Sequence, residues 1–256
     1  MAVTQGSRGK IECFNDFNNR EEVSTAGTGT GALVPPTGVT AIGDLAYISV
    51  NEGEITWTID EGNGVISLTT DVGDDDNVVL IAGRWLPSVQ GPLALEARFK
   101  HDGAATTFPA VFCGFTETLA LDTPVMPAEF ATATMTYNGT GQMLGAQMDI
   151  DGTTDDYRAL AGDAAAVQGT DRSTRTALVA GGLRALETLT ADEWYIIRVE
   201  LSEAGEGKVW VGHKGRSLDL IGDFTALSTT NPMYAILMFE NRTGAARVLE
   251  ADYLFA

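Results

Sequence analysis

The sequence predicts an all-β antiparallel protein, and three observations support this fold class. Apolar and polar residues alternate with a period of two in several short stretches, most clearly over residues 93–100 and 194–201. Turn residues separate these stretches at short intervals, and the chain has 29 glycines to supply such turns. Helical periodicity is almost absent, while 44% of the residues are apolar. Together these features are typical of a β-sandwich or barrel with a sizeable core.

The strand signals follow one another along most of the chain. Residues 20–46 are rich in Gly, Thr and Pro and predict no regular structure; residues 158–190 predict a long loop with one helical turn or a strand pair. We therefore expect an N-terminal arm, first strand and extended loop over residues 1–46, followed by one sandwich domain over residues 47–256. Strands are expected at residues 10–17, 55–59, 65–69, 78–81, 93–100, 110–115, 131–137, 142–150, 194–201, 208–214, 234–240 and 247–255.

The charge balance excludes two classes of partner. The chain has 16 Lys and Arg against 35 Asp and Glu, a formal net charge of −19. Such a field repels the phosphate backbone of nucleic acids and an anionic membrane surface. The first residues lack the apolar core of a signal peptide, and no stretch has the length of a membrane span. We expect synthesis and folding in a cytoplasm.

Four stretches, taken in order, resemble the concanavalin A-like lectin and glucanase superfamily. They are LEARFK at residues 95–100, FCGF at 112–115, WYIIRVE at 194–200 followed by KVWV at 208–211, and LEADYLF at 249–255. The resemblance covers residues 50–256. It implies a two-sheet antiparallel jelly-roll sandwich, which here follows an extended N-terminal arm.

The first stretch of the chain adds a second resemblance. Residues 9–17, GKIECFNDF, are similar to the opening of jelly-roll proteins in tailed-phage virions, with Asn15 where those proteins carry an acid. This implies a non-enzymatic virion protein, a head decoration (cement) protein on the outer capsid surface, whose partners are the major capsid protein and sister subunits in a trimer. The residues expected to contact capsid or sister subunits are Arg8, Lys10, Phe14, Phe17, Pro35 and Pro36.

Catalytic patterns are missing from the sequence. Retaining glucanases of this superfamily place two Glu on one strand in an E-x-D-x-x-E pattern, with carboxyl groups about 5–5.5 Å apart, and no such pattern occurs here. A Gly-x-Ser-x-Gly elbow is also absent. His101 is expected in an exposed turn, His213 on the surface at a strand end, and Cys113 in the core. The sequence thus predicts no enzyme and no cofactor.

Acidic residues offer a candidate cation site. Asp149, Asp151 and Asp155 lie within seven residues, and carboxylates are the ligands that calcium prefers. The spacing does not match an EF-hand loop, and the Asp151-Gly152 pair is an ordinary turn signal. Two interpretations remain: a solvated acidic turn or a calcium site.

Two tryptophans are candidates for contact with a glycan. Trp57 alternates in phase with apolar neighbours and is expected in the core, and Trp194 is expected to pack at a sheet edge. Trp85 stands near a loop, and Trp210 is out of phase with Val209. Exposed aromatic rings are what jelly-roll lectins use to stack sugars. The alternative function is therefore a carbohydrate-binding, lectin-like module, on a tail fibre or secreted, and a diverged glucanase is the third.

Overall fold

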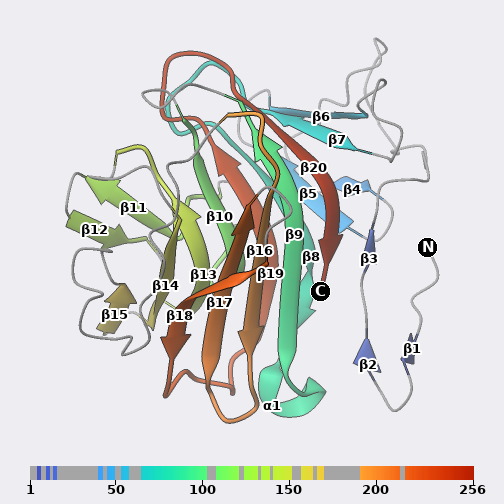
Figure 1. Cartoon of the computed structure of the whole chain (residues 1–256), viewed down its shortest axis with the longest axis vertical. Helices are drawn as coiled ribbons and strands as arrows, with labels where there is room; N and C mark the ends of the chain where they lie inside the picture. Colours follow the sequence, from blue (N-terminus) through green and yellow to red (C-terminus); the bar gives the residue numbers. More distant parts are fainter. Residues whose placement is uncertain are drawn as a thin grey trace.

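The computed structural model shows two antiparallel sheets that pack face to face (Figure 1). Sheet 1 has the strand order β15 (Ala166–Gly169), β14 (Arg158–Asp163), β13 (Met143–Met148), β10 (Ala110–Thr116), β19 (Met233–Glu240), β8 (Asn77–Trp85), β5 (Leu45–Ser49) and β4 (Thr40–Ile42). Sheet 2 has the order β18 (Asp219–Phe224), β17 (Gly207–His213), β16 (Tyr195–Leu201), β9 (Leu93–His101), β20 (Val248–Phe255), β7 (Ile66–Thr69) and β6 (Glu54–Trp57), and β3 (Phe14–Asn15) also pairs with β20.

Smaller elements complete the chain. β1 (Gln5–Gly6) pairs with β2 (Lys10–Ile11), β11 (Ala128–Ala131) pairs with β12 (Thr134–Tyr137), and α1 covers Pro87–Gln90. The structure describes residues 5–6, 10–11, 14–15, 40–42, 45–49, 53–57, 65–102, 108–120, 124–131, 134–138, 141–151, 157–163, 166–169, 191–213 and 217–256. Within these residues no helix is long and apolar enough to cross a membrane. The predicted two-sheet antiparallel sandwich is confirmed.

The main core lies between the two sheets, where the strand alternation predicts it. In β9 and β16, every second side chain is buried, from Leu93 to His101 and from Tyr195 to Leu201. Cys113 is fully buried in the same core, as expected. Each buried Leu, Val or Phe side chain contributes about 1.5–3 kcal/mol to folding. The residues between them face outward and are half-buried, so sheet 2 has one apolar and one polar face.

The central strands of sheet 1 are covered on both of their faces. All side chains of β10 and β13 are buried, because one set packs into the main core and the other beneath residues 117–120 and 124–130. Met126 and Leu119 pack on Phe112 and its neighbours, and Phe130 of β11 packs on Leu160 of β14. Polar side chains hold this cover in place: Asn77 Nδ2 donates to the Pro124 carbonyl (2.8 Å).

Several strand predictions need correction. Residues 40–42 and 45–46, predicted as loop, belong to β4 and β5 at the edge of sheet 1, because their backbone pairs with β8 through β5. Residues 158–163 and 166–169 form the predicted strand pair, but β14 also extends sheet 1. Strand β18 was not predicted. The division at residue 46 stays a prediction, although β5 spans it. Arg8, Phe17, Pro35 and Pro36 lie outside the described residues, and of Lys10 and Phe14 only the strands β2 and β3 are described.

A β-bulge in β20 decides which residues of the last strand face outward. Ala251 pairs with Phe99 and Tyr253 pairs with Arg98, so Asp252 is the extra residue. Asp252 and Tyr253 are consequently both half-buried, and the alternation after them is reversed. Phe255 therefore lies on the outer face of sheet 2.

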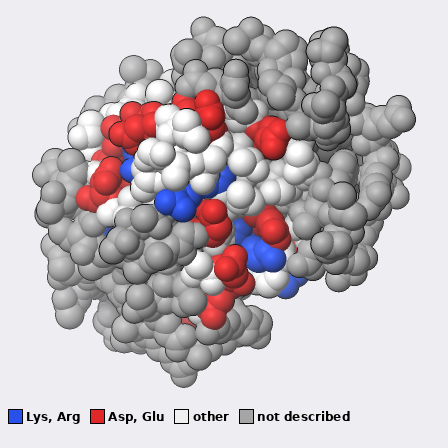
Figure 2. All heavy atoms as spheres, turned by 90° about the horizontal axis from the view of Figure 1, so that it is seen from above, with Lys and Arg blue, Asp and Glu red and all other residues white. Residues whose placement is uncertain are grey.

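One buried arginine joins the strand ends at one end of the sandwich. Arg242, in the loop between β19 and β20, is 5% exposed at its side chain and pairs with Asp75 (2.6 Å), Asp149 (3.2 Å) and Glu240 (3.0 Å). Burial raises the pKa of Glu240 to about 8, so that carboxyl holds a proton and reduces the excess of negative charge around the guanidinium. Seen from this end, acidic side chains gather with a few basic ones among them (Figure 2).

Replacing Arg242 tests the importance of this cluster. Arg242→Ala leaves the buried Asp149 carboxylate without its cation and removes the partner of the Glu240 carboxyl, and we expect the free energy of unfolding to fall by about 3–5 kcal/mol. Urea denaturation measures the change. Arg84→Ala is the matched control: Arg84 is exposed, its guanidinium lies 4.7 Å from the Tyr234 ring, and its removal should cost about 1 kcal/mol or less. Equal losses in the two variants would contradict this role.

The prediction that His101 lies in an exposed turn is wrong. His101 is the last residue of β9, is 1% exposed, and stacks on Tyr195 with ring centroids 5.7 Å apart. Its Nε2 has no hydrogen-bond partner among the described residues. Burial lowers the pKa of His101 to about 4. His213, predicted on the surface, is 13% exposed at its side chain, stacks on the other face of Tyr195, and bonds to Glu193.

The buried His101 should make stability depend on pH. The unfolded chain takes up a proton at His101 below about pH 6.5, whereas the folded chain does so only near pH 4, so folding loses stability as the pH falls between these values. Glu240 acts in the opposite direction, so the contribution of His101 is measured as a difference. Between pH 7 and pH 5, the free energy of unfolding of His101→Phe should rise by about 2 kcal/mol relative to that of the wild type. If plots of the free energy of unfolding against pH run parallel for the two proteins, His101 makes no such contribution.

Candidate functional site

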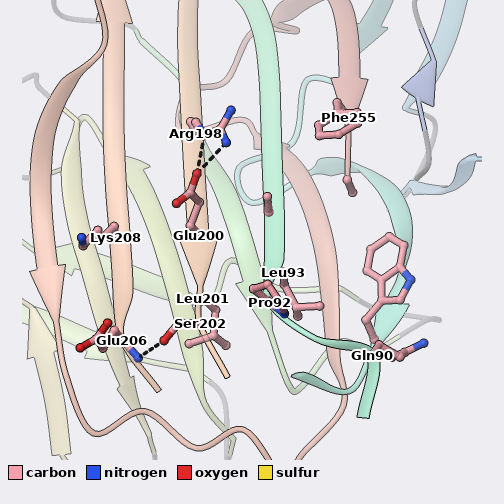
Figure 3. A pocket seen from close by; sticks show the side chains of 13 residues that line it. Gln90, Pro92, Leu93, Arg198, Glu200, Leu201, Ser202, Glu206, Lys208 and Phe255 are labelled. Carbon is pink, nitrogen blue, oxygen red and sulfur yellow. Dashed lines mark hydrogen bonds and ion pairs between the residues drawn. The ribbon is translucent and has the colours of Figure 1, made fainter. Parts of the chain in front are cut away.

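A pocket of about 500 Å³ opens on the outer face of sheet 2, at the end where β16 turns into β17. Arg198 and Glu200 of β16 lie at its centre, Lys208 and Glu206 lie on one side, and Gln90 and Phe255 lie on the other (Figure 3). Trp85, at the end of β8, also lines it. The volume falls within the range of about 300–1,000 Å³ that is usual for small-ligand sites.

Each element brings its residues to the pocket for a local reason. Alternation in β16 and β17 turns Arg198, Glu200 and Lys208 outward, and the predicted hairpin between these strands carries Glu206. Gly205 makes that hairpin possible, because its φ of +80° is one that other residues rarely adopt. The bulge in β20 turns Phe255 outward.

Ion pairs run across the outer face of sheet 2 and hold the pocket floor. Arg198 binds Glu96 on β9 (3.1 Å) and Glu200 on its own strand (2.6 Å). The Tyr253 hydroxyl donates to the other oxygen of Glu96 (2.7 Å). Further along the sheet, Arg98 binds Asp252, and Lys100 binds Glu250 (2.7 Å). These cross-strand pairs fix the side chains in place more than they stabilise the fold, because half-exposed pairs contribute about 0–1 kcal/mol each.

The position of the Trp85 ring depends on Gly83. A Cβ atom at Gly83 would lie 2.6 Å from Cζ2 and Cη2 of Trp85, so the indole packs directly over the glycine backbone. Gly83 also has a φ of +150°, which L side chains rarely adopt. The half-buried ring thus has one face against the protein and borders the pocket with the other parts of its surface.

The structure separates the two tryptophans that the sequence singles out. Trp85 lines the pocket, whereas Trp210 faces outward on β17 beside Arg198 but does not line it. Trp194 lies near the other end of the same face, with Arg98 Cζ 4.4 Å and Lys100 Nζ 5.1 Å from its ring centroid. The side chain of Trp57 lies outside the described residues.

Most other pocket residues were missed by sequence reasoning. The predicted strands include Arg198, Glu200 and Lys208. The alternation of apolar and polar residues identifies which side chains face outward, but it does not identify which of them border a cavity. Gln90 lies in α1, whose signal was available: Pro87 at the first turn and Gly91 just after the last. The helix orients Gln90, whose side-chain oxygen accepts from the Leu86 amide.

The structure describes two of the three candidate calcium ligands, Asp149 and Asp151. Asp149 is neither solvated nor open to a cation: Arg242 and the Phe130 amide bind Oδ2 (3.2 Å each), and the Asp151 amide binds Oδ1 (3.1 Å). Asp151 is exposed, and Asp155 lies outside the described residues. In the part of the chain that the structure describes, no three His, Cys, Asp or Glu side chains are grouped to hold a metal ion.

Comparison with known proteins supports the fold. No family model matches the sequence, and no curated protein matches it. Peanut lectin is similar in structure, with a TM-score of 0.54, 10% identity, and 95% of this chain and 96% of that chain covered. A Shewanella oneidensis MR-1 protein of unknown function reaches a TM-score of 0.48 at 16% identity (96% and 84% covered), and a carbohydrate esterase of bacteriophage phi24B reaches 0.43 at 17% (81% and 88% covered). The likeness to peanut lectin, together with the two antiparallel sheets, shows that the chain has a concanavalin-like jelly-roll fold.

Proposed function

We propose that this protein is a non-catalytic, carbohydrate-binding module of the lectin type, and that the pocket on the outer face of sheet 2 is its binding site. The observation that carries the proposal is the composition of this pocket. Aromatic rings of Trp85 and Phe255 border hydrogen-bonding groups of Gln90, Glu200 and Lys208. A sugar has apolar C–H faces and many hydroxyls, so it needs aromatic surface and paired polar groups in one place.

Two further observations support this proposal. The fold is that of a lectin, although shared fold alone does not imply shared function. The carboxylates of Glu200, which lines the pocket, and of Glu96 on the neighbouring strand are both bound to Arg198, and this favours a positioning role over acid–base catalysis at these residues.

Removing the Trp85 ring tests the proposed site. We expect Trp85→Ala to weaken glycan binding at least about tenfold, because the truncated side chain no longer offers an apolar face. A glycan array, with isothermal titration of the glycans that bind, measures the effect with and without EDTA. The proposal fails if no glycan on the array is bound.

Trp194→Ala is the matched control for this variant. Trp194 is also half-buried on the outer face of sheet 2, but it precedes β16, whereas the pocket lies at the opposite end of that strand. We expect its glycan affinity to equal that of the wild type. A loss of affinity as large as that of Trp85→Ala would show that the site extends over the sheet and is not confined to the pocket.

The virion role is a second candidate, and the N-terminal strands favour it. β1 and β2 pair with each other and, among the described strands, with neither large sheet; Figure 1 shows them apart from the sandwich. A hairpin of this kind has free backbone groups for pairing with another chain. Together with the resemblance of residues 9–17, this supports a decoration protein that reaches a capsid or a sister subunit through its arm.

Deleting residues 1–11 tests the arm. Deleting all of residues 1–46 would also remove β4 and part of β5, so only the shorter truncation separates attachment from folding. We expect the truncated protein to keep its melting temperature and its glycan binding but to lose co-sedimentation with capsids and trimer formation in analytical ultracentrifugation. Unchanged capsid occupancy would exclude the arm as the anchor.

A further inference from the structure

The ionic side chains that line the pocket balance one another. Arg198 and Lys208 carry two positive charges, and Glu200 and Glu206 carry two negative charges, so their formal sum is zero. The whole chain has a formal net charge of −19. The field of the whole chain therefore repels an approaching anion, and the side chains that line the pocket have no excess of positive charge to offset this repulsion.

The guanidinium of Arg198 is already paired with two carboxylates of this chain. Its Nε and Nη2 contact Glu200 Oε1, and its Nη1 contacts Glu96 Oε2. Of the described residues that line the pocket, Lys208 is the cation without an ion pair, and it stands directly across from Glu200 in the register of β16 and β17. A carboxylate or sulfate beside Lys208 would therefore face the carboxylates of Glu200 and Glu206 as well.

The groups that remain free are matched to hydroxyls. Gln90 has a free amide nitrogen, because only its oxygen is bound, and Lys208 has a free ammonium; both are donors. Glu200 keeps Oε2 free, and the Glu206 carboxylate has no partner among the described residues; both are acceptors. Neighbouring hydroxyls of one sugar ring donate and accept at once, so they can satisfy both kinds of group.

We propose that the pocket takes a neutral sugar and discriminates against acidic ones, with Glu206 as the residue that sets this preference. The inference rests on the proposed glycan-binding function and adds the chemical class of its ligand. The sugar ring packs against Trp85 and Phe255, while its hydroxyls bond to Lys208 and the free oxygens of Glu200 and Glu206. Like-charge contact with Glu206 is the physical reason for excluding uronic acids, sialic acids and sulfated sugars.

Matched pairs of neutral and acidic ligands test the proposal. The probes are a panel of neutral disaccharides and the corresponding disaccharides with a uronic acid in place of one hexose, titrated at low and high salt. We expect the neutral member of each bound pair to bind at least about tenfold more tightly, with a Kd that does not change with salt. The proposal is wrong if the acidic member of a pair binds more tightly than the neutral member and its affinity falls as salt is added.

A charge reversal at Glu206 supplies a second readout. Glu206→Lys gives the lining an excess of positive charge, and we expect it to raise the affinity for acidic disaccharides about tenfold and to make that binding salt-sensitive. Glu203→Lys is the control: Glu203 is exposed in the same hairpin but does not line the pocket, and the change in total charge is identical. Equal effects of the two variants would show a general field effect and contradict a role for Glu206.

The outcomes separate this inference from the proposed function. If Trp85→Ala abolishes binding while acidic glycans bind more tightly than neutral ones, the pocket is the glycan site and the neutral preference is wrong. If neither class of glycan binds the wild-type protein, the proposed function and this inference are both wrong.

Discussion

At its centre, sheet 1 is covered on both faces, on one by sheet 2 and on the other by residues 117–120 and 124–130. Its central strands therefore have buried side chains on both sides, and they are apolar almost throughout. The cover is pinned by polar side chains such as Asn77, which lies close to the buried Arg242 cluster. The outer face of sheet 2, by contrast, carries half-exposed side chains along β9, β16 and β17.

The outer face of sheet 2 is where charge and aromatic side chains meet. In a chain with a net charge of −19, Arg98, Lys100 and Arg198 on this face are each paired with acids of the same or neighbouring strands. The ion pairs contribute little to stability at this exposure. Their effect is to fix the side chains around the pocket, so that a ligand meets preorganised groups. Binding by such a face needs no motif of consecutive residues.

The likeness to peanut lectin has a limited meaning. At 10% identity it shows that the same arrangement of strands is reached by a very different sequence, and the assignment of a ligand depends on this chain's own side chains. Our proposal of a sugar ligand rests on the aromatic rings and the balanced charges of the pocket. The proposed attachment to other chains rests on a different feature, the N-terminal hairpin, and the two proposals are compatible.

The sequence by itself determined the all-β class, the alternation of β9 and β16 and the burial of Cys113, because burial on one face of a strand imposes a period of two on adjacent residues. It also singled out Trp85. Only the tertiary structure decided that His101 is buried, that Asp149 binds Arg242, and that the bulge at Asp252 turns Phe255 outward. These features depend on pairing between residues far apart in the chain, and local sequence patterns do not predict which distant residues pair. The charge balance of the pocket arises in the same way, from side chains that only the folded sheet brings together.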